Sequence, residues 1–252
     1  MATIAIGDIH GNVAALDDML HQLLDEAGTK DTIVFLGDYI DRGPDSKQCV
    51  DAILRFERET RAAVVCLLGN HEDWLLRTLG DHTRHSWLLG MEALETIRSY
   101  SADAAEELRA ALSTAGFGPY VGRSALPYQV FFDCVPQDHI RFFRSLSLFH
   151  QDADSVYSHG GLDTRIAGLQ DQGREAFIWG AGSFPYGYGG AETVVYGHHN
   201  NATLDGQGRP TPKIIGRTIG IDTIAHGVLT AVRMPDRKVF QSAPFHPRKS
   251  DG

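Results

Sequence analysis

The sequence predicts an α/β fold with a mainly parallel first sheet and a second sheet that is partly antiparallel. Short apolar runs that end in glycine indicate buried strands leading into tight loops. The first two runs are followed by apolar residues at helical spacing, and strand–helix units in series favour parallel strands. The last hundred residues contain short strand-like runs and Gly-rich turns, which are typical of a second sheet.

The strand-like runs and helices follow a simple order along the chain. Strands are expected at residues 3–6, 32–36, 63–68, 155–157 and 193–196, and helices at 13–27 and 46–58. From Trp74 to about Ala115 the pattern predicts an almost continuous helical stretch. We interpret residues 74–150 as a helical cap inserted into the α/β unit. Further strand-like runs at 214–224 and 227–233 complete the second sheet.

Composition limits the class of protein. A chain of 252 residues with 42% hydrophobic residues can bury one large core, so residues 1–252 are expected to form a single domain. The formal charge of −9, without a long Lys/Arg run, argues against nucleic-acid or anionic-membrane partners. Cys49, Cys66 and Cys134 lack metal-binding or disulfide-framework spacing. No export leader or membrane span is visible, so we expect a cytoplasmic protein.

Five clusters of Asp, Asn, His and Gly come directly after the five apolar runs. They occupy residues 7–12, 37–43, 69–72, 158–161 and 197–199. Ligands of open α/β sheets bind beyond the carboxyl ends of strands, so these clusters are expected to meet in space. Taken singly, each has a simpler interpretation, such as a solvated loop, a helix N-terminus or a surface ion pair. The coincidence of five strand-end clusters favours a common site.

Oxygen and imidazole groups in these clusters match the ligands of two divalent ions. Asp38 is the expected bridge; Asp8 and His10 would hold the first ion with it, and Asn70, His159 and His198 would complete the second. A donor set without thiolate suits manganese, iron or zinc better than calcium. Two such ions activate water for direct hydrolysis of a phosphate ester.

Three further residues fit roles in that reaction. His71 directly follows Asn70 and is the candidate general acid that protonates the leaving oxygen. Asp41 would accept a hydrogen bond from this imidazole and raise its pKa. Arg42 would bind the phosphate with its planar fork of donors, with Asn70 also facing the substrate.

The five motifs together resemble the calcineurin-like metallophosphoesterases, and within them the phosphoprotein phosphatase branch. The similarity covers nearly the whole chain and is strongest to small bacterial members, among them lambda-phage-type phosphatases and symmetrical diadenosine tetraphosphate hydrolases. It implies a sandwich of two mixed sheets flanked by helices and a dinuclear centre commonly filled by manganese or iron. It also implies the same ligand, acid and arginine positions as those given above.

Two positions depart from the family pattern. Members usually carry a second phosphate-binding arginine shortly after the Trp that corresponds to Trp179, whereas here the chain continues Gly-Ala-Gly-Ser. Arg165 or Arg174 are candidate replacements from neighbouring segments. In the last cluster His199 follows His198, so either histidine is a candidate for the ligand position.

The leading functional hypothesis is a metal-dependent phosphomonoesterase, with protein phosphoserine or phosphothreonine as the substrate class that the resemblance implies. The alternative is a symmetrical dinucleoside polyphosphate hydrolase, in which Trp74, Trp87 or Tyr100 would stack a base, although aromatics at helical spacing are more often core residues. A third hypothesis is a non-catalytic phosphate-binding module, prompted by the missing arginine. The native metal pair and the oligomeric state do not follow from the sequence.

Overall fold

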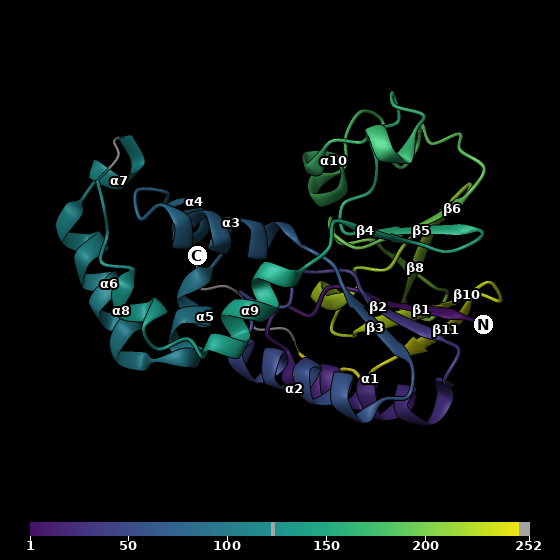
Figure 1. Ribbon diagram of the computed structural model, residues 1–252, viewed down its shortest axis with the longest axis horizontal. Helices are drawn as coiled ribbons and strands as arrows, with labels where there is room; N and C mark the ends of the chain where they lie inside the picture. Colours follow the sequence, from purple (N-terminus) through teal and green to yellow (C-terminus); the bar gives the residue numbers. More distant parts are fainter. Residues whose placement is uncertain (122–123, 247–252) are drawn as a thin grey trace.

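The computed structural model describes residues 1–121 and 124–246. Two β-sheets pack face to face, and helices cover both outer faces (Figure 1). Helices α1 (Val13–Glu26) and α2 (Ser46–Glu59) lie against the first sheet, while α10 (Arg174–Trp179) lies against the second. This four-layered arrangement confirms the predicted sandwich of two sheets flanked by helices.

The first sheet has the strand order β11-β10-β1-β2-β3. Its strands are β1 (Thr3–Ile6), β2 (Thr32–Phe35), β3 (Ala63–Cys66), β10 (Thr230–Met234) and β11 (Lys238–Gln241). Strands β1, β2 and β3 run parallel, as the series of strand–helix units predicts, and β10 and β11 add antiparallel pairs at one edge. The carboxyl ends of β1, β2 and β3 therefore lie along one edge of this sheet.

The second sheet has the order β4-β5-β6-β9-β8-β7 and is also mixed. Its strands are β4 (Phe149–Gln151), β5 (Ser155–Ser158), β6 (Thr193–Tyr196), β7 (Ala202–Leu204), β8 (Pro210–Ile215) and β9 (Thr218–Gly220). Strands β5, β6 and β9 are parallel, whereas β4, β7 and β8 pair antiparallel. Three carboxyl ends again lie side by side.

Alternation of side chains along the strands creates three apolar layers. In β1, Ile4 and Ile6 join the cluster under α1 and α2, while Ala5 faces the space between the sheets. In β6, Val195 faces that same inter-sheet space and Val194 packs with α10 on the other side. Because neighbouring strand residues point to opposite faces, a continuous apolar run is buried on both faces of each sheet.

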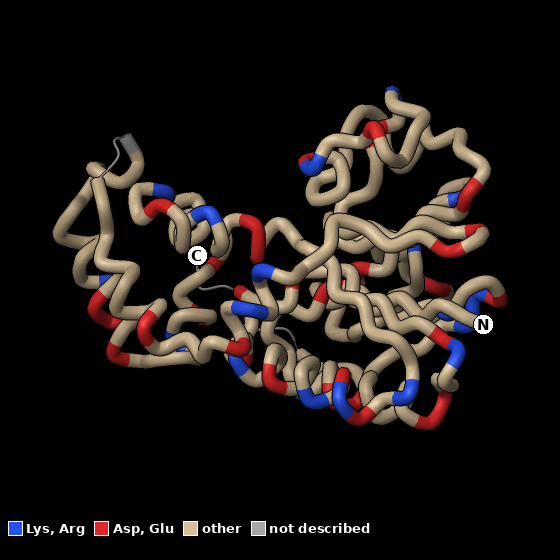
Figure 2. Tube along the Cα trace, viewed as in Figure 1, with Lys and Arg blue, Asp and Glu red and all other residues tan. Residues whose placement is uncertain are grey.

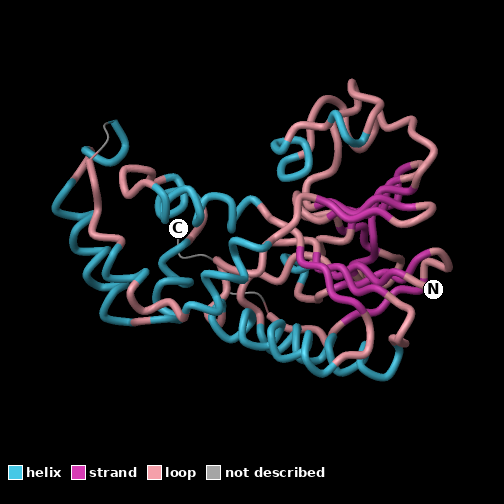
Figure 3. The backbone as a smooth tube through the Cα atoms, viewed as in Figure 1, coloured by secondary structure: helices cyan, strands magenta, loops and turns pink. Residues whose placement is uncertain are grey.

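The chain between β3 and β4 forms the helical cap. It contains α3 (Asn70–Gly80), α4 (Ser86–Gly90), α5 (Ala93–Tyr100), α6 (Ala102–Ala115), α7 (Gly118–Val121), α8 (Gln129–Phe132) and α9 (Gln137–Ser145). These helices gather on one side of the sandwich (Figure 3). The two ends of the insertion meet, since the Leu68 N–H donates to the Ser147 carbonyl (2.8 Å) and the Ser147 N–H to the Cys66 carbonyl (3.0 Å).

The stretch from Trp74 to Ala115, predicted to be almost continuously helical, is mostly helical but is divided into four helices. After Gly80 the chain turns where Asp81 accepts hydrogen bonds from Thr83. Glu92 then adopts a left-handed backbone with φ of 56° before α5. Ser101 has an extended backbone that ends α5 and caps α6. The apolar residues keep their helical spacing on both sides of these breaks, so the spacing alone does not reveal them.

The end of the chain also differs from the expectation. The predicted strand at 214–224 is a hairpin of β8 and β9, because Gly216 turns the chain with φ of 57°. Helix α10 lies in a region for which only strands and turns were expected, and β11 was not predicted. The division of 214–224 matters for the site because it gives β9 a carboxyl end of its own.

The charged residues of the outer helices, the cysteines and the apolar length of the helices describe the surface and the thiols of this protein. In Figure 2, charges of both signs lie along the outer helix α2, whereas the Asp and Glu residues of α1 are not accompanied by Lys or Arg in that helix. The three cysteines have free thiols, and that of Cys49 is buried. Within the described ranges, none of the helices combines the length and the apolarity needed to cross a bilayer.

The cap of α6 gives a test of how this part of the fold is stabilised. The Ser101 side chain accepts a hydrogen bond from the Ala104 N–H (3.2 Å). We expect Ser101→Ala to lower the free energy of unfolding by about 1 kcal/mol, measured by urea denaturation. Ser101→Asp keeps a capping oxygen and should remain near the wild-type value; equal losses in both variants would contradict the capping role.

Candidate metal centre

Loops from both sheets converge at the carboxyl ends of the parallel strands. The Ile9 and His10 N–H groups donate to the Asp38 carbonyl (3.0 and 2.9 Å), which joins the loops after β1 and β2. From the second sheet, the His159 ring reaches the Leu36 carbonyl at the end of β2 (3.1 Å). The structure thus brings the clusters of the two sheets together.

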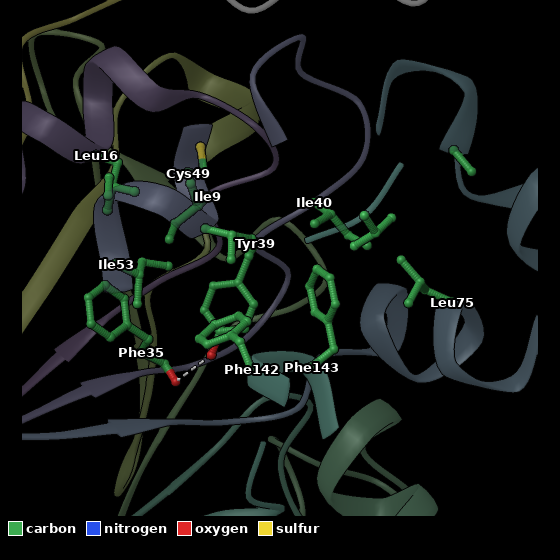
Figure 4. Packing of buried hydrophobic residues seen from close by; sticks show 14 of the residues in the cluster. Ile9, Leu16, Phe35, Tyr39, Ile40, Cys49, Ile53, Leu75, Phe142 and Phe143 are labelled. Carbon is green, nitrogen blue, oxygen red and sulfur yellow. Dashed lines mark hydrogen bonds between the residues drawn. The ribbon is translucent and has the colours of Figure 1, made fainter. Parts of the chain in front are cut away.

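Apolar residues anchor the two loops of the first sheet. Ile9 lies between Asp8 and His10, and Tyr39 and Ile40 follow Asp38; all three apolar side chains are fully buried. Figure 4 shows them within the core, where the Tyr39 ring meets that of Phe142. The Tyr39 hydroxyl also donates to the Leu67 carbonyl (2.7 Å). Apolar and polar residues therefore alternate within these loops, one set fixing the backbone and the other forming the site.

The backbone of these loops is strained. Among the described residues, nine that are not glycine have positive φ, and seven of them belong to the site loops: His10, Asp38, Asp41, Arg42, His198, His199 and Asn200. A left-handed conformation is unfavourable for residues with a Cβ atom and persists only where surrounding contacts fix it. Such strain collects at functional sites.

The Asp38 carboxylate stands at the centre of the cluster. Its Oδ2 lies 3.5 Å from His10 Nε2, and its Oδ1 lies 3.4 Å from His159 Nε2. The carboxylate thereby belongs to two groups of close ligand atoms, one with His10 and His71 and the other with His159 and His198. One oxygen directed to each group is the arrangement expected of a bridging carboxylate.

Hydrogen bonds fix the orientation of the imidazoles. The Nδ1 atoms of His10 and His159 lie 3.1 Å from the carbonyls of Ile40 and Leu36. We assign the proton to Nδ1 in each ring, which leaves Nε2 as an acceptor directed at Asp38. Burial lowers the pKa of both rings, and burial with neighbouring His159 lowers the pKa of His198 to about 2. Neutral imidazole is the form that binds a metal.

Unsatisfied polar atoms show that a cation fits between these groups. Among the described residues, His198 Nε2 is buried without a hydrogen-bond partner. The Oδ1 of Asn70 lies 2.9 Å from His159 Nε2, so two acceptors face each other. Buried, uncompensated acceptors of this kind are costly, and a divalent cation would satisfy them.

Asp8 lies beside the cluster rather than inside either group of three. Its Oδ2 is 3.9 Å from His10 Nε2, and its carboxylate accepts the His198 N–H (3.1 Å). Gly197 permits this approach, because a Cβ at that position would lie 2.1 Å from Asp8 Oδ1. Burial, followed by the charges of Asp222 and Asp38, raises the pKa of Asp8 well above its usual value. A bound cation would oppose this repulsion.

Two buried carboxylates at the site were not assigned roles from the sequence. Glu72 accepts hydrogen bonds from the backbone N–H groups of Asp38 (3.0 Å), Tyr39 (2.9 Å) and Ile40 (3.2 Å). Burial and then the charge of Asp38 raise its pKa to about 8. Asp222 follows β9 and lies near Asp8. A carboxylate directly after a short apolar strand is a signal of a site residue, but here it lay inside the single strand-like run expected at residues 214–224.

Asp41 contacts His71 as predicted, and cap residues hold it. The His71 ring and the Trp87 indole both donate to Asp41 Oδ2 (2.7 and 2.9 Å), and the Thr96 hydroxyl donates to Oδ1 (2.5 Å). Trp87 is fully buried and so does not offer a face for stacking. The hydroxyl of Tyr100 contacts the His139 ring inside the cap (2.7 Å), which leaves Trp74 as the candidate stacking residue.

The arginines and His199 take distinct positions. Arg42 is exposed and its Nη1 lies 2.9 Å from His10 Nε2, at the edge of the cluster. Arg165 pairs with Asp163, and Arg174 pairs with Asp73 (2.5 Å), so both candidate replacements engage other carboxylates. His199 turns its Nε2 towards the Trp179 carbonyl (3.2 Å), whereas His198 joins Asp38 and His159.

Metal removal gives a direct test of the site. Because ligands that bind only the folded state stabilise it, Mn²⁺ at 100 times its dissociation constant should stabilise the chelator-treated protein by about 2.7 kcal/mol per bound ion. Thermal unfolding would show this as a higher melting temperature. The effect should be markedly smaller for Asp38→Asn, which alters the shared carboxylate; an equal gain in both proteins would mean that the ions bind elsewhere.

Comparison with known proteins gives relatives that match about a third of the chain and one that matches nearly all of it. The zinc-dependent endopolyphosphatase of Saccharomyces cerevisiae is 35% identical over 69 residues, which are 27% of this chain and 20% of that protein. The symmetrical bis(5'-nucleosyl)-tetraphosphatase of Proteus mirabilis is 38% identical over 85 residues, 34% of this chain and 29% of that protein. The asymmetrical bis(5'-nucleosyl)-tetraphosphatase of Oceanobacillus iheyensis is 23% identical and covers 96% of this chain and 92% of its own length.

Solved structures share the fold. A protein provisionally named a diadenosine tetraphosphatase aligns with a TM-score of 0.62 at 20% identity, covering 97% of this chain and 94% of that one. A serine/threonine phosphatase from Saccharomyces cerevisiae aligns with a TM-score of 0.55 at 16% identity, covering all of this chain and 82% of that one. Residues 1–202 match the sequence profile of the calcineurin-like phosphoesterases. The chain is therefore a member of the calcineurin-like phosphoesterase family.

Proposed function

We propose that this enzyme hydrolyses phosphate monoesters at a centre of two divalent ions that share Asp38. The observation that carries the proposal is the position of the two Asp38 oxygens, each within about 3.5 Å of a different imidazole. Asp8 and His10 complete one ion site, and Asn70, His159 and His198 complete the other. Manganese, iron and zinc all suit these donors, and manganese is our choice for assays.

The chain's own groups supply the proton and the orientation. When bound, two such ions provide an activated water and polarise the phosphoryl group. His71 keeps Nδ1 on Asp41 and presents Nε2 beside Asp38, 3.8 Å from its Oδ2. Burial lowers the pKa of His71, but the charge of Asp38 and the hydrogen bond to Asp41 outweigh it and raise the pKa. A histidine held in its protonated form can protonate a leaving alkoxide.

Arg42 is placed to bind the substrate phosphate. It lines an open pocket of about 610 Å³ together with His10, Asn12 and Glu92, so its guanidinium lies between solvent and the cluster. Phosphoserine and phosphothreonine of proteins are the substrate class that we propose, because an open pocket admits a phosphorylated side chain. The free cysteines suit a reducing compartment, and we place the enzyme in the cytoplasm.

The combination of His71, Asp41 and Arg42 also distinguishes an enzyme from a phosphate-binding module. A binding site has no use for a buried imidazole whose carboxylate partner is fixed by two further side-chain donors, Trp87 and Thr96. Protonation of a leaving group requires that arrangement.

Replacing the proposed acid tests the mechanism. We expect His71→Asn to lower kcat for a phosphoserine peptide by 10²- to 10⁴-fold, because general acid catalysis contributes about that factor. The loss should be smaller for p-nitrophenyl phosphate, whose leaving group needs little protonation. Metal content, measured by mass spectrometry, should remain two ions per chain. Equal losses on both substrates, or loss of one ion, would instead make His71 a ligand.

A second candidate function is hydrolysis of dinucleoside polyphosphates. A pocket of about 660 Å³ in the cap is lined by Trp74, Arg77, Arg84 and Tyr120, a combination of aromatic and cationic groups that suits a nucleotide. The pocket adjoins the metal centre through Trp74, whose ring contacts that of Trp179, which in turn contacts His198. The names of the Proteus mirabilis and Oceanobacillus iheyensis relatives point the same way.

Trp74→Ala separates the two substrate classes. If a base stacks on Trp74, the variant should lose 10-fold or more in kcat/KM for diadenosine tetraphosphate, since stacking contributes ~1–3 kcal/mol per base. Rates on p-nitrophenyl phosphate should stay within about twofold. Trp74→Phe is the matched control and should retain most of the dinucleotide activity. A parallel decline on both substrates would exclude a base site at Trp74.

A further inference from the structure

The turn that carries His198 has an unusual backbone. His198, His199 and Asn200 are consecutive residues with φ of 56°, 63° and 49°, and none of them is glycine. Each left-handed residue with a Cβ atom costs roughly 1–2 kcal/mol. Three in succession will not persist unless other groups hold them. The contacts of this turn therefore decide where the His198 ring lies.

Two carboxylates hold the turn by its backbone N–H groups. The His198 N–H donates to Asp8, with both oxygens at 3.1 Å, and the Asn200 N–H donates to Asp222 Oδ2 at 2.7 Å. The Asn201 amide adds a hydrogen bond to the Gly197 carbonyl (2.6 Å) from the other side. Asp8 belongs to the proposed ligands, but Asp222 has no role in the mechanism described above.

The sheet register explains why Asp222 lies here. Strands β6 and β9 are parallel and pair Tyr196 with Gly220. Two residues further along each strand, this register brings Asp222 to the level of His198. Asp222 is only 3% exposed, and its Oδ1 has no hydrogen-bond partner within the part of the chain that the structure describes. A buried carboxylate near Asp8 and Asp38 is costly, so its retention points to a specific use.

We propose that Asp222 is a positioning residue that holds residues 198–200 in their left-handed form through the Asn200 N–H and so directs His198 at the metal centre. The inference rests on the proposed role of His198 as a ligand. It concerns the hydrogen bond and not the charge of Asp222. A hydrogen bond to the Asn200 backbone restrains the third left-handed residue of the turn, and His198 lies two residues before it.

Substitutions at position 222 separate the hydrogen bond from the charge. Asp222→Asn keeps a carbonyl oxygen that can accept the Asn200 N–H but removes the charge, whereas Asp222→Ala removes both. Titration calorimetry of Mn²⁺ into chelator-treated protein should show two ions with near wild-type affinity for Asp222→Asn. In Asp222→Ala one of the two ions should bind 10- to 100-fold more weakly, the range seen when outer partners of metal ligands are lost.

A second substitution tests the backbone argument directly. Glycine adopts positive φ without the Cβ penalty, so Asn200→Gly should restore most of the Mn²⁺ affinity lost in Asp222→Ala. The matched control is Arg237→Gly, which relieves a left-handed residue (φ 58°) between β10 and β11, far along the chain from this turn, and should restore none. If Asp222→Ala does not fold alone, the inference requires the Asp222→Ala/Asn200→Gly protein to fold and to bind two ions.

The reference variant His198→Ala separates this inference from the proposed metal centre. Loss of one ion in His198→Ala, with full affinity in Asp222→Ala, would overturn the role of Asp222 and leave the centre intact. Two ions retained in His198→Ala would overturn the ligand assignment itself. Equal weakening in Asp222→Asn and Asp222→Ala, or failure of Asn200→Gly to restore binding, would show that charge rather than backbone position matters and would also overturn the inference.

Discussion

The arrangement of the site depends on three hydrogen bonds that Glu72 accepts. Its carboxylate binds the backbone N–H groups of Asp38, Tyr39 and Ile40, and the Asp38 Oδ1 accepts the His71 N–H in return (3.2 Å). The first turn of α3 and the loop after β2 are thus locked together. Because each Asp38 oxygen faces a different imidazole, a rotation of this carboxylate would disrupt both groups at once. The left-handed backbone of Asp38 is the conformation that these contacts impose.

Buried negative charge is the second constraint on this centre. Asp8, Asp38, Asp41, Glu72 and Asp222 are all at most 3% exposed. Arg42 is the cation that acts on several of them, and it lies at the rim. Each carboxylate is given backbone or side-chain donors, yet their mutual repulsion remains. The repulsion between carboxylates is therefore concentrated at the site where divalent ions would bind and offset it. The cap shares in this, since Trp87 and Thr96 reach from α4 and α5 to hold Asp41.

Local patterns predicted the parts of the structure that depend on local chemistry. The strands before Asp8 and Asp38 follow from apolar runs ending in glycine, and the strand before His159 follows from a short apolar run. Parallel strands bring the carboxyl ends of such strands together. The sequence did not reveal the breaks around Glu92 and Ser101, because helical spacing continues through them. Contacts between distant residues were also missed: Trp87 lies 46 positions from Asp41, and no spacing rule links them. Asp222 was hidden because a hairpin turn at Gly216 lies inside an apolar run.

The cap leaves β3 of the first sheet and returns towards β4 of the second at neighbouring backbone positions, where Leu68 and Ser147 share a hydrogen bond. An insertion whose ends are already adjacent imposes no distance on the chain that it interrupts. During evolution the part of this segment beyond the first turn of α3 can lengthen, shorten or be exchanged, while Asn70, His71 and Glu72 keep their places after β3. Only the few side chains that reach from it to Asp41 would need replacement. Related proteins could in this way come to bind different substrates while the residues at the strand ends, and the reaction they support, stay the same.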